Sequence, residues 1–430
     1  MKTLKNELLG DSLKHEFRVS EKDFSRKRKQ PFSATLLFMI NLLRKSLAIE
    51  IDSFMNFLYG KQHTSKSFTQ SAFVQARKKI SPDVFKKLSQ TIINEFYTDN
   101  QDGIGLWNGF RVLAVDGSRI TLPNTDELEA NYGKTKNQSQ TSIVQARCPV
   151  LYDVENNYVI DGTLAPLAEG ERALAISHLH HCKLGDLLIY DRGYPSYGLI
   201  HEHISRELDY VIRVKPAFSQ LIMDFESSKK KSQLVNIFPG KNTKLSDKPY
   251  DRNTPIKVRL VRVDLPSGQV EILITSLLSN KTYPHRMFKA LYAKRWGVET
   301  FYDELKVKLK IENFSGYSPK SILQDFYATL FVSNVQTLIV SELEEEMAKE
   351  TQTRKYKYKV NKNLSYGFLK NRIIGLFINE EDIKTVISEL KELFKKHLIP
   401  IRPNRSNKRE IGKYRSRIKP VITKNQKDAL

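Results

Sequence analysis

The sequence predicts an α/β protein with a helical region at each end and a β-rich insertion in its core. Before about residue 105, apolar residues recur at the three- and four-residue spacing of amphipathic helices. Between residues 106 and 215, short runs of strand-forming residues alternate with helical segments, as in a mixed sheet covered by helices. From residue 216 to 284, strand-like runs lie among polar and basic stretches, which indicates the insertion.

The N-terminal region, residues 1–105, is predicted to be a set of helices. A first apolar face at helical spacing is outlined by Leu36, Leu37, Ile40, Leu43 and Leu47. Gly60 is the expected stop of that helical stretch. A second helical pair is expected over Phe68–Ile80 and Pro82–Phe96, with Ser81 as the N-cap of its second helix.

The turn of this second pair is rich in positive charge. Five basic residues surround it: Arg77, Lys78, Lys79, Lys86 and Lys87. A compact, basic helical hairpin suits docking on DNA. It equally suits an ordinary helical bundle with a solvated basic face, and the local pattern leaves both interpretations open.

Residues 106–215 form the first part of the predicted core. Strands are expected over Phe110–Asp116, Asp186–Asp191 and Tyr210–Lys215, with a hairpin between Thr141–Val150 and Tyr158–Leu164. Helices are expected over Glu171–Leu179 and Ser196–Leu208.

The rest of the chain divides into three further segments. The insertion, residues 216–284, carries the strand-like runs Ile256–Val263 and Gln269–Thr275. Helical patterning returns over residues 285–347, the second part of the core. Residues 348–430 form a C-terminal region with a basic aromatic stretch at 354–359, a helix over Glu381–Leu398 and a basic tail from Asn404 that we expect to be mobile.

Charge is the most unusual feature of the composition. The chain has 70 Lys and Arg against 48 Asp and Glu, which gives a formal net charge of +22 and a sequence pI near 9.6. An excess of this size attracts polyanions. Nucleic acid is the commonest of them, and the alternatives are a merely soluble basic protein or one that binds an acidic membrane.

The cysteines and the apolar stretches indicate a cellular compartment. Cys148 and Cys182 are the only cysteines, which is typical of small core residues in a reducing environment. The first residues lack the apolar run of a signal peptide, and the stretch Ala34–Leu43 is too short to cross a bilayer. We expect a cytoplasmic protein without a membrane partner.

Two acidic residues, Asp116 and Asp191, each follow an apolar strand-like run. In α/β sheets, functional groups gather at the carboxyl ends of strands. Two carboxylates brought together there repel each other and favour a counter-cation such as Mg²⁺, which binds carboxylate and phosphate oxygens. Taken alone, either residue could simply cap a turn.

A third element stands in the segment from Leu291 to Lys306. Tyr292, Arg295, Glu299 and Lys306 are separated by three, four and seven positions, which on a helix places all four on one face. A carboxylate between two cations suits a site where Glu299 binds metal while Arg295 and Lys306 hold phosphates. A surface helix with spaced ion pairs is the alternative.

The quartet resembles the Tyr-(2)-Arg-(3)-Glu-(6)-Lys signature of bacterial DDE transposases of the insertion-sequence-four family. Two further motifs of that family match Leu113-Ala-Val-Asp116-Gly-Ser and Leu188-Ile-Tyr-Asp191-Arg-Gly-Tyr194. The resemblance covers roughly residues 65 to 340. The segment Gln70–Lys79 also looks like the helical N-terminal region of the family, which favours DNA docking by residues 1–105.

The resemblance implies an RNase H-like catalytic core in which Asp116, Asp191 and Glu299 converge on two Mg²⁺ ions, with Mn²⁺ as a substitute. It implies cut-and-paste cleavage at the terminal inverted repeats of an insertion sequence, followed by strand transfer into target DNA. It also implies a homodimer on the DNA and a nucleoid-associated protein. The residues it assigns to DNA contact are Tyr292, Arg295, Lys306, Arg192, Arg213 and Lys215.

One position departs from the family pattern. Some members carry a Trp just before the strand that matches Ile272–Thr275, where it can stack on an extruded base, and Glu271 occupies that position here. Trp296 is expected to pack in the core. The cluster His178, His180 and His181 does not present one tetrahedral face on a helix, so we expect no zinc site there.

Two other functions compete with transposition. A non-catalytic DNA-binding protein descended from a transposase would be favoured by loss of one of the three acids, and all three are present. A metal-dependent nuclease without strand transfer would use the same chemistry. The quartet and the basic insertion argue against that nuclease.

Overall fold

The computed structural model describes residues 1–402 apart from 27–29, 61–62, 101–102, 137–141 and 379. The basic tail predicted from Asn404 lies outside the described residues. The chain forms two compact units. We call residues 1–99, 120–146 and 303–430 the helical unit, and residues 100–119 and 147–302 the sheet unit. Both interleave separated segments, so neither coincides with one of the five segments predicted from the sequence.

The sheet unit is built on a mixed β-sheet. Its strands are β1 (Arg111–Thr121), β3 (Ser142–Asp153), β4 (Val159–Gly162), β5 (Asp186–Tyr190), β6 (Asp209–Val214), β7 (Ser232–Ile237), β8 (Ile256–Asp264) and β9 (Val270–Thr275). They follow the order β3-β1-β5-β6-β9-β8-β7, and β4 pairs with β3. The central strands β1, β5 and β6 are parallel, while β9, β8 and β7 continue the sheet in antiparallel pairs.

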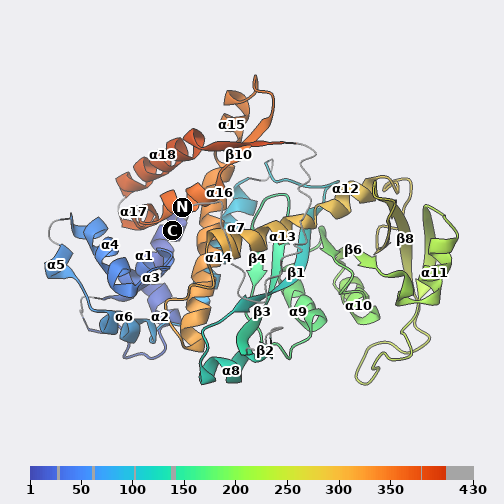
Figure 1. The fold of residues 1–430 in the computed structure, drawn as a ribbon, viewed down its shortest axis with the longest axis horizontal. Coiled ribbons are helices and arrows are strands. Elements are labelled where there is room, and N and C mark those ends of the chain that lie inside the picture. The colour runs from blue at the N-terminus through green and yellow to red at the C-terminus, as the bar shows by residue number, and fades with distance from the viewer. Residues whose placement is uncertain (27–29, 61–62, 101–102, 137–141, 379, 403–430) are drawn as a thin grey trace. The chain divides into compact units, whose positions relative to one another are not determined.

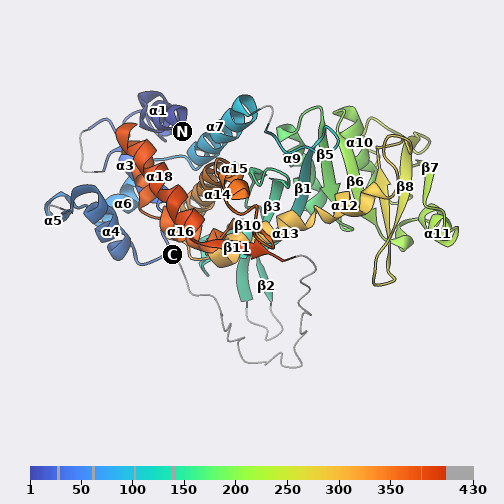
Figure 2. The ribbon, with the colours of Figure 1, turned by 90° about the horizontal axis from the view of Figure 1, so that it is seen from above.

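Helices cover both faces of this sheet (Figures 1 and 2). They are α9 (Glu171–His178), α10 (Tyr197–Ser205), α11 (Gln220–Ser227), α12 (Met287–Ala293) and α13 (Trp296–Asp303), with the short 3-10 helices η2 (Leu179–His181) and η3 (Pro216–Phe218). Side chains alternate along β5, so Leu187 and Ile189 pack in one cluster with Phe288 of α12. Tyr190 instead contacts the ring of His203 of α10 on the opposite face.

The predicted strands and helices of the core are present, with one difference. The predicted hairpin is formed by β3 and β4, which pair antiparallel. The first strand, predicted to end at Asp116, continues to Thr121 as β1. Residues 216–284 do contain β7, β8 and β9, and these strands extend the core sheet because β9 pairs with β6. Their description as an insertion stays a prediction.

The helical unit is built around α14 (Pro319–Ser341). The other helices are α1 (Lys2–Leu9), α2 (Asp11–Phe17), α3 (Phe32–Ile40), α4 (Leu47–Tyr59), α5 (His63–Lys66), α6 (Gln70–Arg77), α7 (Asp83–Asp99), α8 (Asp126–Tyr132), the π-helix η4 (Glu304–Lys308), α15 (Glu344–Glu350), α16 (Lys362–Leu369), α17 (Arg372–Ile378) and α18 (Glu380–Lys396). Two short pairs, β10 (Lys357–Val360) with β11 (Leu398–Ile401) and β2 (Lys134–Lys136) with the start of β3, complete it.

Helix α14 begins at a capping box. Ser318 accepts a hydrogen bond from the backbone N–H of Ser321, and Pro319 occupies the first turn, where its missing N–H is not needed. Most of the helix is buried, and it contacts α3, α7, α8, α16 and α18. A helix apolar on all sides is stable only when neighbours surround it.

The single helical face predicted from Leu36 to Leu47 is wrong. Helix α3 ends at Ile40 and α4 begins at Leu47. Between them Leu42 has a φ of 55°, a left-handed conformation that ends a helix. Gly60 does follow the end of α4, with a φ of 53° that suits glycine.

The basic hairpin of α6 and α7 uses part of its charge for packing. Arg77 is 3% exposed, and its guanidinium donates to Asp325 at 2.8 Å and to Gln324 at 2.9 Å, both on α14. Lys79 pairs with Asp23, and the Lys86 ammonium lies over the ring of Tyr327. Arg77 therefore holds α6 against α14 and is not available to DNA, and docking by the hairpin stays a prediction.

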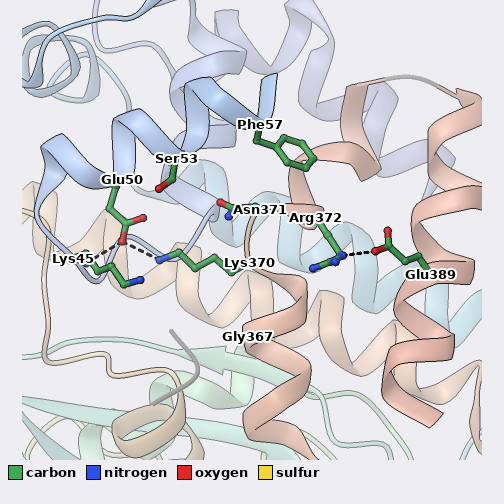
Figure 3. A pocket seen from close by; sticks show the side chains of 9 residues that line it. All are labelled: Lys45, Glu50, Ser53, Phe57, Gly367, Lys370, Asn371, Arg372 and Glu389. Carbon is green, nitrogen blue, oxygen red and sulfur yellow. Dashed lines mark hydrogen bonds and ion pairs between the residues drawn. The ribbon is translucent and has the colours of Figure 1, made fainter. Parts of the chain in front are cut away.

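A cavity of about 550 Å³ in the helical unit is lined by α4, α16, α17 and α18 (Figure 3). Glu50 of α4 is 1% exposed at its wall. Its Oε1 accepts hydrogen bonds from the backbone N–H groups of Arg44 and Lys45 and from Lys370 Nζ, at 3.0, 2.9 and 2.9 Å. The buried carboxylate is therefore fully compensated.

Within the part of the chain that the structure describes, no helix has both the length and the apolar character needed to cross a bilayer.

Candidate active site

The two predicted aspartates lie side by side on neighbouring parallel strands. The registered pairing of β1 and β5 ends at Val115 with Tyr190, and Asp116 and Asp191 are the next residues of the two strands. Asp116 Oδ1 accepts a hydrogen bond from Gly117 N at 2.8 Å, and Asp191 Oδ1 accepts one from Gly193 N at 2.7 Å. Each carboxylate is thus held by a backbone N–H group of the residues that follow it.

Helix α13 brings Glu299 to the same region of the sheet. The Tyr302 hydroxyl lies 2.8 Å from the carbonyl oxygen of Asp116 and 2.7 Å from that of Cys148, which fixes the helix over β1 and β3. The ring of Phe301 stacks on Tyr152 at 5.1 Å. Gly297 permits this close approach, since a Cβ there would lie 3.2 Å from Val154 Cγ1.

Electrostatics connect the three acids. Burial raises the pKa of Asp116 to about 6, and the charges of Asp191 and Glu299 act in the same direction. The Gly117 N–H and the Arg295 guanidinium act against this increase. A carboxyl group with like charges as neighbours is an unfavourable arrangement for an apoprotein, and it is typical of functional sites.

Arg295 supplies the positive charge at this site. Its Nη2 donates to Glu299 Oε1 at 2.7 Å, and its guanidinium lies over the rings of Trp296 and Tyr292 at 5.1 and 5.8 Å. The Tyr292 hydroxyl is buried and has no hydrogen-bond partner among the described residues. Burial raises the pKa of Tyr292 to about 12, so the phenol remains a donor. A buried hydroxyl without a partner suits a ligand oxygen.

Two predictions about this helical segment are wrong. The quartet does not lie on one continuous helix, because α12 ends at Ala293, α13 begins at Trp296 and the π-helix η4 follows Asp303. Lys306 is therefore not related to Glu299 by regular helical turns, and it belongs to the helical unit. Trp296, expected in the core, is 54% exposed.

The remaining predicted DNA contacts differ in their surroundings. Arg192 and Lys215 are exposed. Arg213 is half-buried, and its Nη1 forms an ion pair with Glu271 Oε1 at 2.8 Å. Glu271, the residue at the position where some family members carry Trp, therefore neutralises a predicted phosphate contact.

Glu171 and Arg147 are neighbours of the site that the sequence pattern does not indicate. Glu171, the first residue of α9, accepts a hydrogen bond from Arg147 Nη1 at 2.6 Å. Its side chain approaches both Gly117 and Gly193, the glycines that follow the two aspartates. An acid in the first turn of a helix is common, so its sequence position gave no signal of this role.

The donor set fits a hard divalent cation in its chemistry. Asp116, Asp191 and Glu299 supply carboxylate oxygens, the ligands that Mg²⁺ prefers, and their mutual repulsion favours a counter-cation. Among the described residues, no three His, Cys, Asp or Glu side chains are arranged to hold a metal ion. Glu299 is instead bonded to Arg295, so metal binding requires its carboxylate to turn from the guanidinium.

Comparisons with known proteins identify a family. The family model described as Transposase DDE domain matches residues 107–335. Transposase InsG for insertion sequence element IS4 of Escherichia coli (strain K12) is 20% identical over 271 residues, 62% of this chain and 60% of that protein. The protein y4zB of Sinorhizobium fredii (strain NBRC 101917 / NGR234) is 24% identical over 184 residues, 43% of this chain and 47% of that protein. The chain thus spans less than two thirds of either relative.

Among solved structures, the cryo-EM structure of a piggyBac transposase synaptic complex with hairpin DNA has a TM-score of 0.42 and 9% identity, covering 92% of this chain and 80% of that chain. A similarity this weak carries no conclusion about the fold. The family model, however, matches more than half of the chain and includes all three acids of the site. The chain belongs to the family of transposase DDE domains.

Proposed function

We propose that this protein is a transposase that cuts and joins DNA strands, with Asp116, Asp191 and Glu299 as its catalytic carboxylates. The observation that supports it best is the placement of Asp116 and Asp191 one residue beyond the last registered pair of β1 and β5. Glu299 is close enough that its charge raises the pKa of Asp116.

The three carboxylates would hold two Mg²⁺ ions, or Mn²⁺ in their place. When bound, these ions neutralise charge at phosphorus and activate an oxygen nucleophile. Once Glu299 turns to the metal, the Arg295 guanidinium is released from its ion pair and can donate to a phosphate oxygen. The Tyr292 hydroxyl, for which the described part of the chain offers no hydrogen-bond partner, can donate to a second one.

Further DNA contacts are proposed for exposed and half-buried cations. Arg192 and Lys215 lie at the ends of β5 and β6, beyond the last strand residues, and are exposed there. Arg213 can contribute once its ion pair with Glu271 opens. Lys306 is proposed to contact the phosphate backbone from the helical unit.

At the level of the whole protein, we propose cut-and-paste mobilisation of an insertion sequence. Its partners would be the terminal inverted repeats and target DNA, bound by a homodimer, in the cytoplasm at the nucleoid. The similarity to the E. coli transposase for an insertion sequence element supports this proposal. A mass measurement of the DNA complex tests the dimer, and one chain per pair of ends would contradict it.

The central test is a cleavage assay on DNA that carries the flanking ends of the protein's own gene. We expect cleavage and joining with Mg²⁺, and none with a chelator. Asp224→Asn, which removes an exposed acid on α11, serves as the matched control and should retain activity. DNA binding without cleavage would indicate the non-catalytic binding protein, and cleavage without joining would indicate the nuclease.

A further inference from the structure

Glu171 has a well-defined environment in the sheet unit. It is the first residue of α9, and its side chain is 50% exposed. Arg147 binds it from β3 with an Nη1 to Oε1 distance of 2.6 Å. The same guanidinium donates through Nε to the carbonyl oxygen of Leu167 at 3.1 Å, which fixes the orientation of Arg147. The carboxylate of Glu171 is therefore held in place by an anchored partner.

The Glu171 side chain approaches the glycines that follow both aspartates, Gly117 and Gly193. The point that a Cβ of Gly193 would occupy is 4.0 Å from Glu171 Oε2 and 3.1 Å from Asp191 Oδ1. The point that a Cβ of Gly117 would occupy is 3.9 Å from Glu171 Cγ and 3.5 Å from the Tyr194 hydroxyl. One acidic side chain thus approaches the residue after Asp116 and the loop of Asp191 together.

The buried hydroxyl of Tyr194 lies near the same carboxylates. This side chain is 2% exposed. Burial raises the pKa of its hydroxyl far above the ordinary value, and the carboxylates of Asp116, Glu171 and Asp191 raise it further, while Arg147 acts in the opposite direction. Glu171 and the two aspartates thus all act on the same buried hydroxyl.

We propose that Glu171 is a positioning residue of this site, a fourth acid whose charge, anchored by Arg147, strengthens divalent-cation binding by Asp116 and Asp191. This rests on the proposed function, because the cation is part of it. Glu171 itself lies beside the two glycines that follow the aspartates. A carboxylate there stabilises a nearby cation through its charge and through hydrogen bonds from water on the cation.

The test is a calorimetric titration of the full chain with Mn²⁺ in the absence of DNA, which measures the Mn²⁺ affinity. Glu171→Gln should weaken Mn²⁺ binding by about tenfold or more, the usual effect of removing an outer partner of a metal site. Glu171→Asp, which retains the charge, should recover a large part of the affinity. Glu202→Gln is the matched control, because it breaks an Arg–Glu ion pair on α10 in the same unit and should leave Mn²⁺ affinity unchanged.

Thermal unfolding in a chelator separates positioning from a structural role. Without metal, Glu171→Gln removes a like charge from the site, so its Tm should be equal to or higher than that of the wild type. A lower Tm with unchanged Mn²⁺ affinity would overturn the proposal and make Glu171 a structural partner of Arg147.

Asp116→Asn distinguishes a failure of the role of Glu171 from a failure of the proposed metal site. If it removes Mn²⁺ binding while Glu171→Gln does not weaken it, only the role of Glu171 fails. If neither variant affects binding, the proposed metal site itself fails.

Discussion

Each of the two units contains a carboxylate that is largely buried, Glu50 in the helical unit and Asp116 in the sheet unit, and the charges around the two differ. Glu50 in the helical unit accepts three hydrogen bonds, one of them from the Lys370 ammonium (Figure 3). Asp116 in the sheet unit accepts one backbone N–H and faces the charges of Asp191 and Glu299. The first acid pairs with a cation within the fold, whereas the second lies among like charges, against which the Arg295 guanidinium acts.

This difference separates a structural acid from a functional one. A buried carboxylate that is paired and hydrogen-bonded needs nothing further, and breaking its pair is costly. A cluster of carboxylates that repel one another makes the apoprotein less stable, and a cation or a proton relieves it. The comparison therefore assigns opposite consequences to removing the two charges.

The largest expected effect is on catalysis. Asp116→Asn, Asp191→Asn and Glu299→Gln should each lower single-turnover cleavage by about a thousandfold or more, since a metal site contributes several kcal/mol to transition-state stabilisation. DNA affinity should change little. Glu50→Gln should retain its activity per folded molecule, and a comparable loss in that variant would break the distinction between the two acids.

The second effect is on stability. Glu50→Ala leaves the Lys370 ammonium, 10% exposed, without its carboxylate. We expect a loss of about 3–5 kcal/mol in the free energy of unfolding, the range for breaking a buried ion pair. Urea denaturation measures it. Glu389→Ala is the control, because this 49% exposed acid lines the same cavity and pairs with Arg372 at its rim, so its loss should cost less than about 1 kcal/mol.

The third effect is a gain in the free energy of unfolding, opposite in sign to the second effect, and it depends on pH. The pKa of Asp116 rises from 3.8 to about 6 on folding, so the folded state binds this proton more tightly. In a chelator, this group makes the free energy of unfolding fall as pH rises from about 4 to about 6. Asp116→Asn should therefore be more stable than the wild type at pH 7 by about 2–3 kcal/mol, and nearly equal to it at pH 4. Urea denaturation of both proteins at pH 4 and pH 7 measures the difference. A variant less stable than the wild type at pH 7 would refute the view that burial and neighbouring like charges make the Asp116 carboxylate unfavourable in the folded state.

The sequence was sufficient to predict the strand pairing that brings Asp116 and Asp191 together, whereas their role as site residues stays a prediction. Asp116 and Asp191 were predicted because each follows a run of strand-forming residues, and parallel pairing then brings the two strand ends together. Glu299 was predicted from its spacing to Arg295, which the structure retains as an ion pair at 2.7 Å. Strand-forming runs and short spacings of this kind can be read from residues that are close together in the sequence.

The remaining features depend on contacts between distant residues. Arg77 was assigned to a basic face because its partner Asp325 stands 248 positions away. The break before Trp296 and the π-helix at Lys306 depend on packing that the spacing of residues does not encode. Glu171 was missed for the same reason, since only the tertiary fold places it beside Gly117 and Gly193.

The smallest expected effect is on the salt dependence of DNA binding, where a cation with an ion-pair partner is compared with an exposed one. Lys215 is exposed, whereas the guanidinium of Arg213, two residues earlier, is neutralised by Glu271. If Lys215 contacts a phosphate, Lys215→Ala should lower the slope of log affinity against log salt by about 0.9, because one counterion fewer is released. Arg213→Ala should change that slope less, since the ion pair with Glu271 opposes its phosphate contact. Glu271→Gln should restore a full contribution from Arg213 and steepen the slope. Equal changes for Lys215→Ala and Arg213→Ala in fluorescence anisotropy would mean that the ion pair opens on DNA at no measurable cost.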